Sequence, residues 1–169
     1  LADALTARGA RVFFIGTGWG LEMELVPRGG YELEIADLRG LDRRLSLKLL
    51  LFLWSLVKGS LDCLGIMRRR RPDVVVGFGG YVSALPVLTG ALMRLPRLVV
   101  ELDSHMGLAN RILVPLADRV ALSFPLPERE GGKYILTGRP LGKRLLEADP
   151  EQGRKKFGLK SGRPVVLVT

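Results

Sequence analysis

The sequence predicts an α/β fold of the Rossmann-like, doubly wound class, in which a parallel sheet is buried between helices. Two continuous apolar runs, residues 74–76 and 98–100, are typical of strands buried on both faces of such a sheet. Each run is followed by a turn and then by a segment with helical spacing. This alternation is what parallel strands require, because their ends can be joined only by a crossover.

The remaining elements follow from the same patterns. Helices are expected at 1–8, 21–26, 45–67, 84–93, 112–117 and 143–159, and strands at 11–15, 31–36, 74–76, 98–100, 119–124, 134–137 and 165–169. A helix that opens a doubly wound fold returns from a strand, so a first strand with its loop is expected upstream of Leu1. We therefore divide the chain into a Rossmann-like domain that lacks this strand (1–142), an inter-domain helix and linker (143–163), and the first strand of a truncated second domain (164–169).

The composition limits the classes of function. A length of 169 residues suits one core-forming domain, and a charge of +9 predicts an acidic partner. An anionic membrane surface or a phosphorylated substrate fits better than nucleic acid, because only 7% of residues are aromatic and none alternate with basic ones. The single cysteine, Cys63, excludes an internal disulfide and is expected to be inert in the core or on a membrane face. No signal peptide precedes the first helix, which makes the cytoplasm the default location.

Two loops at neighbouring strand ends form the candidate site. The first carries Gly77, Gly79 and Gly80 before a helix, a pattern that is either an anion site or an ordinary βα turn. The second carries Glu101, Asp103 and Asn110 after the next strand. Because ligands of open α/β sheets sit at the carboxyl ends of strands, both loops would face one crevice. The glycines at 16–20 do not have the spacing of a dinucleotide-binding loop, so no cofactor is expected.

The segment 45–67 is apolar on more than one helical face. One hypothesis is a helix buried between layers, and the other is a helix lying in the membrane interface. The residues of the second hypothesis are Leu50, Leu51, Trp54 and Val57 as the lipid-facing patch, with Lys48 and Lys58 toward anionic head groups. Four arginines at 68–71 would add to that attraction, or would simply suit the end of a helix.

Several sequence blocks resemble those of one enzyme family. GFGGYVS at 77–83, GLANR at 107–111 with Glu101, and SFP at 123–125 are similar to the N-terminal domain of the MurG-type glycosyltransferases of family 28. The blocks at 15–34, 37–40 and 137–140 extend the resemblance over nearly the whole chain. It implies the N-terminal half of a GT-B fold, and transfer, with inversion, of N-acetylglucosamine from UDP-N-acetylglucosamine to undecaprenyl-diphosphate-linked muramoyl-pentapeptide, the lipid I to lipid II step of peptidoglycan synthesis.

The resemblance also assigns roles to residues. It implies an acceptor-binding set of Gly79, Gly80, Tyr81, Val82, Ser83, Glu101 and Asn110. Glu101 is in addition the candidate catalytic residue, and Asp103 lies near the donor. Val100, Asp103 and Gly142 depart from the family pattern, where histidine, asparagine and arginine are usual. His105, the only histidine, is either a base or a loop residue without a role, and no cluster has metal-ligand spacing.

The partners implied are a lipid-linked diphosphate acceptor, a UDP-sugar bound through a further domain, and an anionic membrane surface at the cytoplasmic face of the cell membrane, where the protein is peripheral. The chain alone is expected to be inactive. Two alternatives stay open: a transferase that forms glycolipids, and a non-catalytic subunit that docks a split glycosyltransferase to the membrane.

Overall fold

The computed structural model describes the backbone of residues 1–36, 48–127, 131–160 and 162–166, and the side chains of these residues except at 48–56, 81, 143 and 144. The chain divides into two compact units. The larger unit is Ala2–Arg139, and the smaller one is Pro140–Thr169 together with Leu1.

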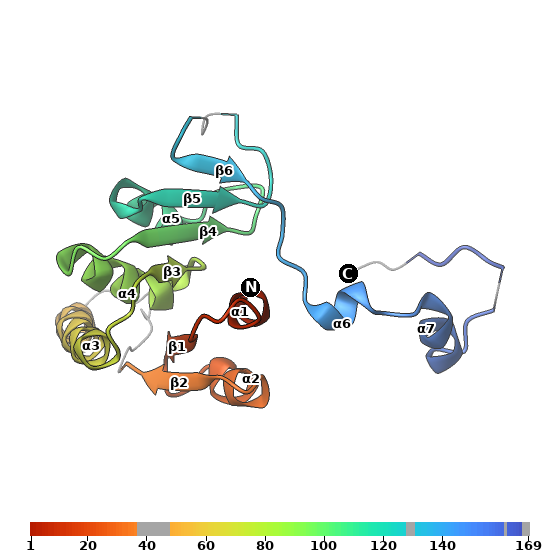
Figure 1. Cartoon of the computed structure of the whole chain (residues 1–169), viewed down its shortest axis with the longest axis horizontal. Coiled ribbons are helices and arrows are strands. Elements are labelled where there is room, and N and C mark those ends of the chain that lie inside the picture. The colour runs from red at the N-terminus through yellow and green to blue at the C-terminus, as the bar shows by residue number, and fades with distance from the viewer. Residues whose placement is uncertain (37–47, 128–130, 161, 167–169) are drawn as a thin grey trace. The chain divides into compact units, whose positions relative to one another are not determined.

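A four-stranded parallel sheet lies at the centre of the larger unit (Figure 1). Its strands, in spatial order, are β3 (Val75–Gly77), β4 (Arg97–Glu101), β5 (Arg119–Leu122) and β6 (Tyr134–Leu136). Because the order in space is the order in sequence, the carboxyl ends of all four strands meet at one edge. The predicted parallel α/β fold is confirmed.

A smaller sheet pairs β1 (Phe13–Gly16) with β2 (Glu32–Ile35), again in parallel. Among the described residues no ladder joins β1 to β3, so the strands form two sheets where the sequence predicted one. Hydrophobic pattern identifies strands, but it does not say which neighbours pair. Ile15 on β1 nevertheless packs against the core clusters beside the larger sheet.

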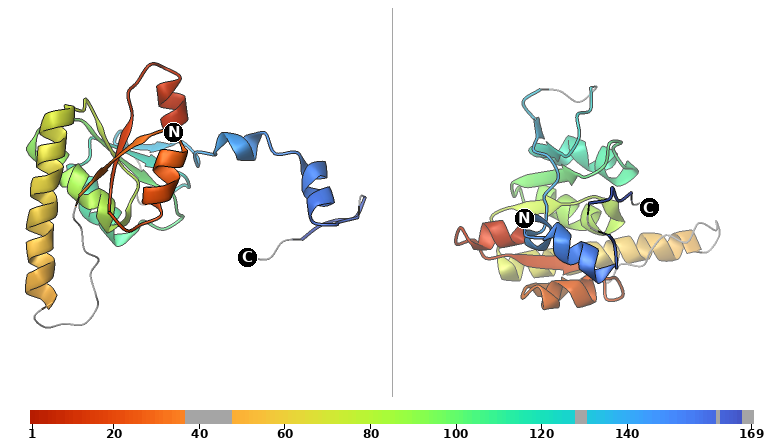
Figure 2. Two further views of the ribbon diagram at one scale, coloured as in Figure 1. Left: turned by 90° about the horizontal axis from the view of Figure 1, so that it is seen from below. Right: turned by 90° about the vertical axis from the view of Figure 1, so that its right-hand side faces the viewer.

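The helices of the larger unit are α1 (Ala2–Thr6), α2 (Glu22–Arg28), α3 (Lys48–Arg70), α4 (Gly80–Leu92) and α5 (Leu108–Leu113), which continues into the 3₁₀ turn η1 (Val114–Leu116). Helix α4 is central: it contacts β1, β3 and β4 and packs between α3 and α5. Figure 2 shows α3, the long yellow helix, running along the outside of this unit.

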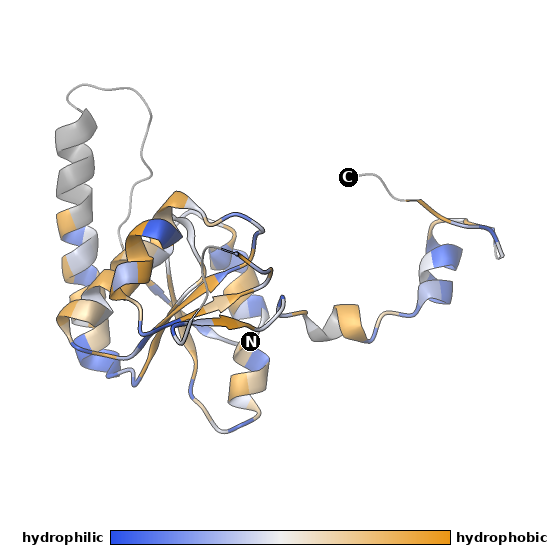
Figure 3. Ribbon diagram, turned by 90° about the horizontal axis from the view of Figure 1, so that it is seen from above, coloured by the Kyte–Doolittle hydropathy of each residue, from blue (hydrophilic) through white to orange (hydrophobic). Residues whose placement is uncertain are grey.

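The core lies between α4 and the larger sheet. Its most deeply buried side chains are those of Met67, Val87, Val99, Leu113 and Val120. The strands and α4 are accordingly coloured mainly as hydrophobic in Figure 3. This burial explains why residues 98–100 form a continuous apolar run in the sequence.

Helix α3 has a buried face and an exposed face in its described part. Cys63 and Met67 are buried, whereas Val57 is 52% and Leu61 62% exposed. Burial, with a smaller contribution from the charge of Asp62, raises the pKa of the Cys63 thiol to about 12, so this cysteine is an inert core residue as expected. Within the described residues, no helix is long and apolar enough to span a membrane.

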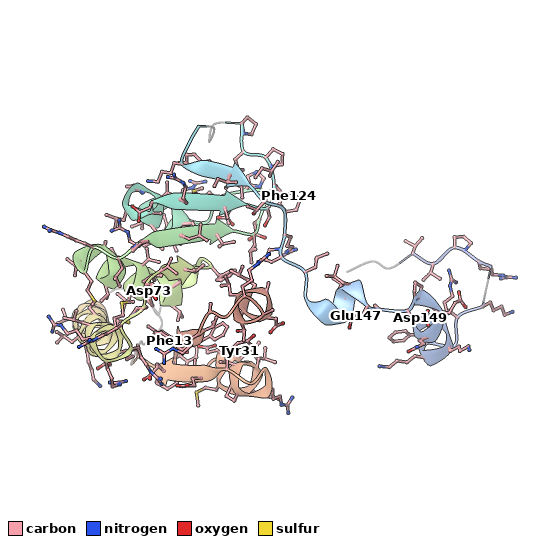
Figure 4. All side chains as sticks on the ribbon, viewed as in Figure 1. Phe13, Tyr31, Asp73, Phe124, Glu147 and Asp149 are labelled. Atoms are coloured by element: carbon pink, nitrogen blue, oxygen red, sulfur yellow. The ribbon has the colours of Figure 1, made fainter. Side chains whose placement is uncertain are left out.

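Charged contacts fasten β2 to the end of α3. Arg70 Nε donates to Glu34 Oε1 at 2.6 Å, and Arg69 lies 2.7 Å from the same carboxylate. The Arg70 guanidinium also pairs with Glu32 and lies 5.7 Å from the centre of the Phe13 ring, which is labelled in Figure 4. The basic run at the end of α3 therefore serves partly as a structural clamp.

The smaller unit contains two short helices, α6 (Lys143–Leu146) and α7 (Pro150–Lys156), in place of the one predicted over 143–159. The break is local, because Asp149 caps α7 by accepting a hydrogen bond from Glu151 N at 2.9 Å, and Pro150 fills its first position. Val165 and Val166 of the predicted strand are exposed and unpaired, and residues 167–169 lie outside the described part.

Candidate functional site

The glycine loop after β3 turns directly into α4. The helix begins at Gly80, four residues before the predicted start. Gly79 (φ +79°) and Gly80 (φ +72°) adopt backbone angles that disfavour other residues. A Cβ on Gly79 would lie 3.2 Å from Asn110 Nδ2. The first N–H groups of α4 have no partner within the helix, and no side chain caps them.

The helical start changes the roles available to residues 81–83. Ser83 Oγ donates to the Gly79 carbonyl at 2.6 Å, so this hydroxyl stabilises the loop and is not free for a ligand in this conformation. Val82 is half-buried and packs against the core cluster around Leu85, which leaves only its backbone for binding. The side chain of Tyr81 lies outside the described part.

Glu101, at the end of β4, has its carboxylate engaged on both oxygens. Oε1 accepts from Asp103 N at 3.0 Å, and Oε2 accepts from Gly107 N at 3.1 Å and from Asn110 Nδ2 at 2.9 Å. The side chain is only 4% exposed. It therefore organises the loop that follows β4, and the bond to Gly107 explains why α5 begins at Leu108, four residues earlier than predicted.

Asn110 lies on α5 and faces the glycine loop. Both hydrogens of its amide are used, because Nδ2 donates to Glu101 Oε2 and, at 3.2 Å, to the Val100 carbonyl. Its Oδ1 is buried and has no partner among the described atoms. A buried acceptor without a donor is costly, so this oxygen is suited to an incoming N–H or O–H group.

These residues line a single cleft of about 330 Å³ at the carboxyl ends of the strands. The structure thus brings together Gly79, Gly80, Glu101, Asp103 and Asn110, as the sequence predicted. The lining is completed by Leu102 and by residues that belong to the blocks of the family resemblance but had no role assigned to them: Phe78, Gly107, Leu108, Ala109 and Arg139. Of these, only Arg139 carries a charge. Its block, 137–140, is part of the family resemblance, but the resemblance assigned it no place in the cleft.

The second glycine turn, at 16–20, is closed by its own helix. Glu22 Oε1 accepts from both the N–H and the hydroxyl of Thr17, at 2.9 and 2.6 Å. A Cβ on Gly20 would lie 2.0 Å from the Glu22 carboxylate, so the glycine is needed for this contact. The hydrogen bonds, that of the Thr17 hydroxyl first, hold the pKa of Glu22 below its usual value. A carboxylate occupies the place where a phosphate would approach.

The other candidates lie apart from the cleft lining. His105 is exposed, with Nδ1 3.1 Å from Ser104 Oγ. Among the described residues, no group of three or more acidic, histidine or cysteine side chains could hold a metal. In the predicted membrane patch, Val57 and Lys58 are exposed. The side chains of Lys48, Leu50, Leu51 and Trp54 lie outside the described part.

Comparison with known proteins places the chain in a family. Residues 1–122 match the N-terminal domain of glycosyltransferase family 28. A UDP-N-acetylglucosamine–N-acetylmuramyl-(pentapeptide) pyrophosphoryl-undecaprenol N-acetylglucosamine transferase from Acetivibrio thermocellus is 36% identical over 93% of this chain and 43% of its own length. The transferase of the same name from Halothermothrix orenii is 34% identical over 99% of this chain and 47% of its own length.

A solved structure supports the same placement. The crystal structure of Acinetobacter baumannii MurG superposes with a TM-score of 0.69 at 25% identity, over 84% of this chain and 40% of that one. The chain spans less than half the length of these proteins.

Proposed function

This chain belongs to glycosyltransferase family 28, and we propose that it is the acceptor-binding part of an enzyme that transfers N-acetylglucosamine from UDP-N-acetylglucosamine to the muramoyl-pentapeptide of lipid I, giving lipid II. The observation that carries the proposal is the cleft itself. Gly79, Gly80 and Asn110 line this cleft, the start of α4 has no side-chain cap, and the buried Asn110 Oδ1 has no partner among the described atoms.

The cleft is chemically suited to a diphosphate that carries a sugar. Unpaired N–H groups at a helix N-terminus bind phosphate oxygens, and the helix dipole favours the negative charge. Gly79 and Gly80 present no side chain that would obstruct this approach. Asn110 Oδ1 accepts a hydrogen bond from a hydroxyl or amide of the attached sugar, which an anion alone could not supply.

In the proposed reaction a hydroxyl of the bound acceptor attacks the anomeric carbon of the UDP-sugar, and UDP leaves from the opposite face. The residues of this chain hold the acceptor, and the UDP-sugar binds through a further domain, with Asp103 at the border between the two. Glu101 supports the site through the loop that it organises, and its role as the base remains a prediction.

Helix α3 provides the proposed contact with the membrane. Its described exposed face carries Val57 and Leu61, and Lys58 and Arg68 are exposed on the same helix. An apolar strip flanked by basic residues binds anionic lipid surfaces from one side. We infer a peripheral location at the cytoplasmic face of the membrane, where a lipid-linked acceptor would be presented to the cleft.

Binding of a water-soluble lipid I analogue with a short prenyl chain tests the proposal. Isothermal titration calorimetry should show that the chain binds this analogue and that Gly80→Val, at φ +72°, removes the binding while circular dichroism shows an intact fold. UDP-N-acetylglucosamine is the matched comparison and should bind weakly or not at all. Binding of the UDP-sugar without binding of the acceptor analogue would contradict the assignment.

A further inference from the structure

Arg139 belongs to the lining of the cleft. It follows β6, and its position is fixed by neighbours: Thr137 N donates to the Leu122 carbonyl at 2.9 Å, and Gly138 N to the same oxygen at 3.3 Å. Pro140, which comes next, restricts the backbone of Arg139 to extended conformations. The guanidinium is thus carried by a segment anchored to the carboxyl end of β5.

This guanidinium is uncommitted. Arg70 and Arg97 are held by carboxylates, with Arg97 Nη2 3.0 Å from Asp118 Oδ2. For Arg139, by contrast, no hydrogen bond or ion pair to another described residue is found, and the side chain is exposed. A planar guanidinium with five donors, in the same cleft as helix N–H groups without a partner inside the helix, matches the oxygens of a phosphate.

Asn110 independently points to a ligand in the same cleft. Its side chain is 3% exposed, and Oδ1 lies 3.5 Å from the position of a Cβ on Gly79, without a donor among the described atoms. The cleft therefore offers cationic donors on one side and a buried acceptor on the other. Such a pair fits a ligand that has both an anionic group and an O–H or N–H donor.

Two carboxylates in the cleft act against an anion, and their effects differ. Glu101 accepts three hydrogen bonds and is buried, so its charge is already stabilised by the protein. Asp103 is exposed, and the described hydrogen bonds involve its backbone N–H. Its charge is screened by solvent, yet it lowers the affinity for a phosphate beside Arg139.

We propose that Arg139 is the specificity-determining residue for the diphosphate, pairing with its oxygens in the cleft that the start of α4 also lines, while Asn110 Oδ1 binds the attached sugar. This inference rests on the proposed function and goes beyond it, because it assigns a charged side chain to a subsite otherwise made of backbone. A sugar diphosphate of this kind could come from the lipid-linked acceptor or from the UDP-sugar, and the probes below separate the two.

The test measures dissociation constants by titration calorimetry of the 169-residue chain with three probes: inorganic pyrophosphate, farnesyl diphosphate and UDP-N-acetylglucosamine. Arg139→Gln should raise the dissociation constants of pyrophosphate and farnesyl diphosphate about tenfold or more, as expected for loss of a charge-assisted hydrogen bond. Arg139→Lys should restore part of the affinity. Asp103→Asn should strengthen it by a few fold, because a repulsive charge is removed.

The matched control is Arg119→Gln, which removes the same charge at the other end of β5, away from the cleft. It should leave all three dissociation constants unchanged. If Arg139→Gln weakened the binding of UDP-N-acetylglucosamine alone, Arg139 would bind the donor. If Arg139→Gln and Arg119→Gln weakened binding equally, the effect would be a general loss of positive charge. Either result overturns the acceptor assignment.

Failure of this inference differs from failure of the proposed function. If the chain binds farnesyl diphosphate and loses it with Gly80→Val but not with Arg139→Gln, the glycine-loop site stands and the role of Arg139 is refuted. If the unmodified chain binds none of the diphosphates, both are refuted.

Discussion

Replacing Glu101 by glutamine tests whether Glu101 acts as a catalytic base or only organises the loop that follows β4. Glutamine has the same shape, but it has one oxygen where the carboxylate has two. The best arrangement keeps the oxygen at the Oε2 position, facing Gly107 N and Asn110 Nδ2. The new NH₂ group then meets Asp103 N, donor against donor.

The energy follows from counting these contacts. One hydrogen bond to a charged group is lost, and two become bonds to a neutral amide, which are weaker. With about 1.5–3 kcal/mol for a bond to a charged group and about 0.5–1.5 kcal/mol for a neutral one, Glu101→Gln should destabilise the chain by roughly 3.5–6 kcal/mol. Urea unfolding measures this difference. Asp103→Asn is the control, because that carboxylate is exposed, and it should change the stability by less than about 0.5 kcal/mol.

Kinetics in an active, complete enzyme adds the second half of this test. If Glu101 only positions the loop, Glu101→Gln raises the KM for the acceptor and leaves the pH dependence of kcat in place. If Glu101 is the base, the acid limb of the kcat profile disappears. If Glu101→Gln left the stability unchanged and removed the acid limb of the kcat profile, the conclusion that Glu101 positions the loop would be refuted.

Three further predictions concern the loop, the membrane face and acid stability. Gly80→Ala should weaken binding of a diphosphate and cost about 1–2 kcal/mol, seen in urea unfolding, because its φ of +72° disfavours a Cβ. Val57→Ser with Leu61→Ser should release the chain from anionic vesicles in co-sedimentation and change the melting temperature little, because both are more than half exposed. The Arg70 bond lowers the pKa of Glu34 below its ordinary 4.5, so this stabilisation is complete above that value and is lost as the pH falls through the folded pKa. Glu34→Gln should flatten the loss of stability that begins near about pH 5 and continues to lower pH.

Each of these predictions has a control within the chain. Gly107→Ala tests whether any glycine change at the cleft has the same effect, since a Cβ there meets nothing within 4 Å and no positive φ is required. Met67→Ala, on the buried face of α3, should cost about 2–5 kcal/mol and leave vesicle binding of the folded protein unaltered. If the Val57 and Leu61 variants lost stability like Met67→Ala, the exposed face would be part of the core and the membrane contact would be wrong. If the stability of Glu34→Gln fell with pH as it does in the unmodified chain, the contact between Arg70 and Glu34 would not contribute to acid unfolding.

The sequence predicted the elements of the fold better than their pairing. Val99 and Val100 are buried in the sheet, and a strand buried in this way has an apolar sequence. The apolar run 98–100 could therefore be recognised as a strand from the sequence. The separation of β1 from β3 has no such local cause, because a ladder depends on which edges come together. The early start of α4 could have been anticipated from two adjacent glycines, but the apolar pattern begins only at Ala84 and set the predicted boundary too late.

The candidate site was predicted where residues follow strands directly and was missed where distant segments converge. Glu101 and Asn110 belong to one strand end and the helix after it, so their proximity follows from the chain itself. Arg139 reaches the cleft because β6 pairs with β5, which in turn pairs with β4. Its place depends on two strand registers, so the block 137–140 could be identified in the sequence without showing that Arg139 lies in the cleft.

The two glycine turns of the chain show what distinguishes a binding loop from a structural one. Both follow a parallel strand and lead to a helix, and their glycine patterns alone are equally weak evidence. In the turn at 16–20 the helix returns its own carboxylate, that of Glu22, to the N–H and hydroxyl of Thr17, so the donors are satisfied within the protein. At Gly79 and Gly80 no acidic residue follows in the first turn of α4. Ser83 donates to the Gly79 carbonyl, and Asn110 turns its two donors toward Glu101 and Val100. The N–H donors of the loop at Gly79 and Gly80 and the oxygen of Asn110 are therefore both left for a ligand. Whether a glycine turn can bind a ligand is decided less by its glycines than by the side chain that does or does not occupy the turn.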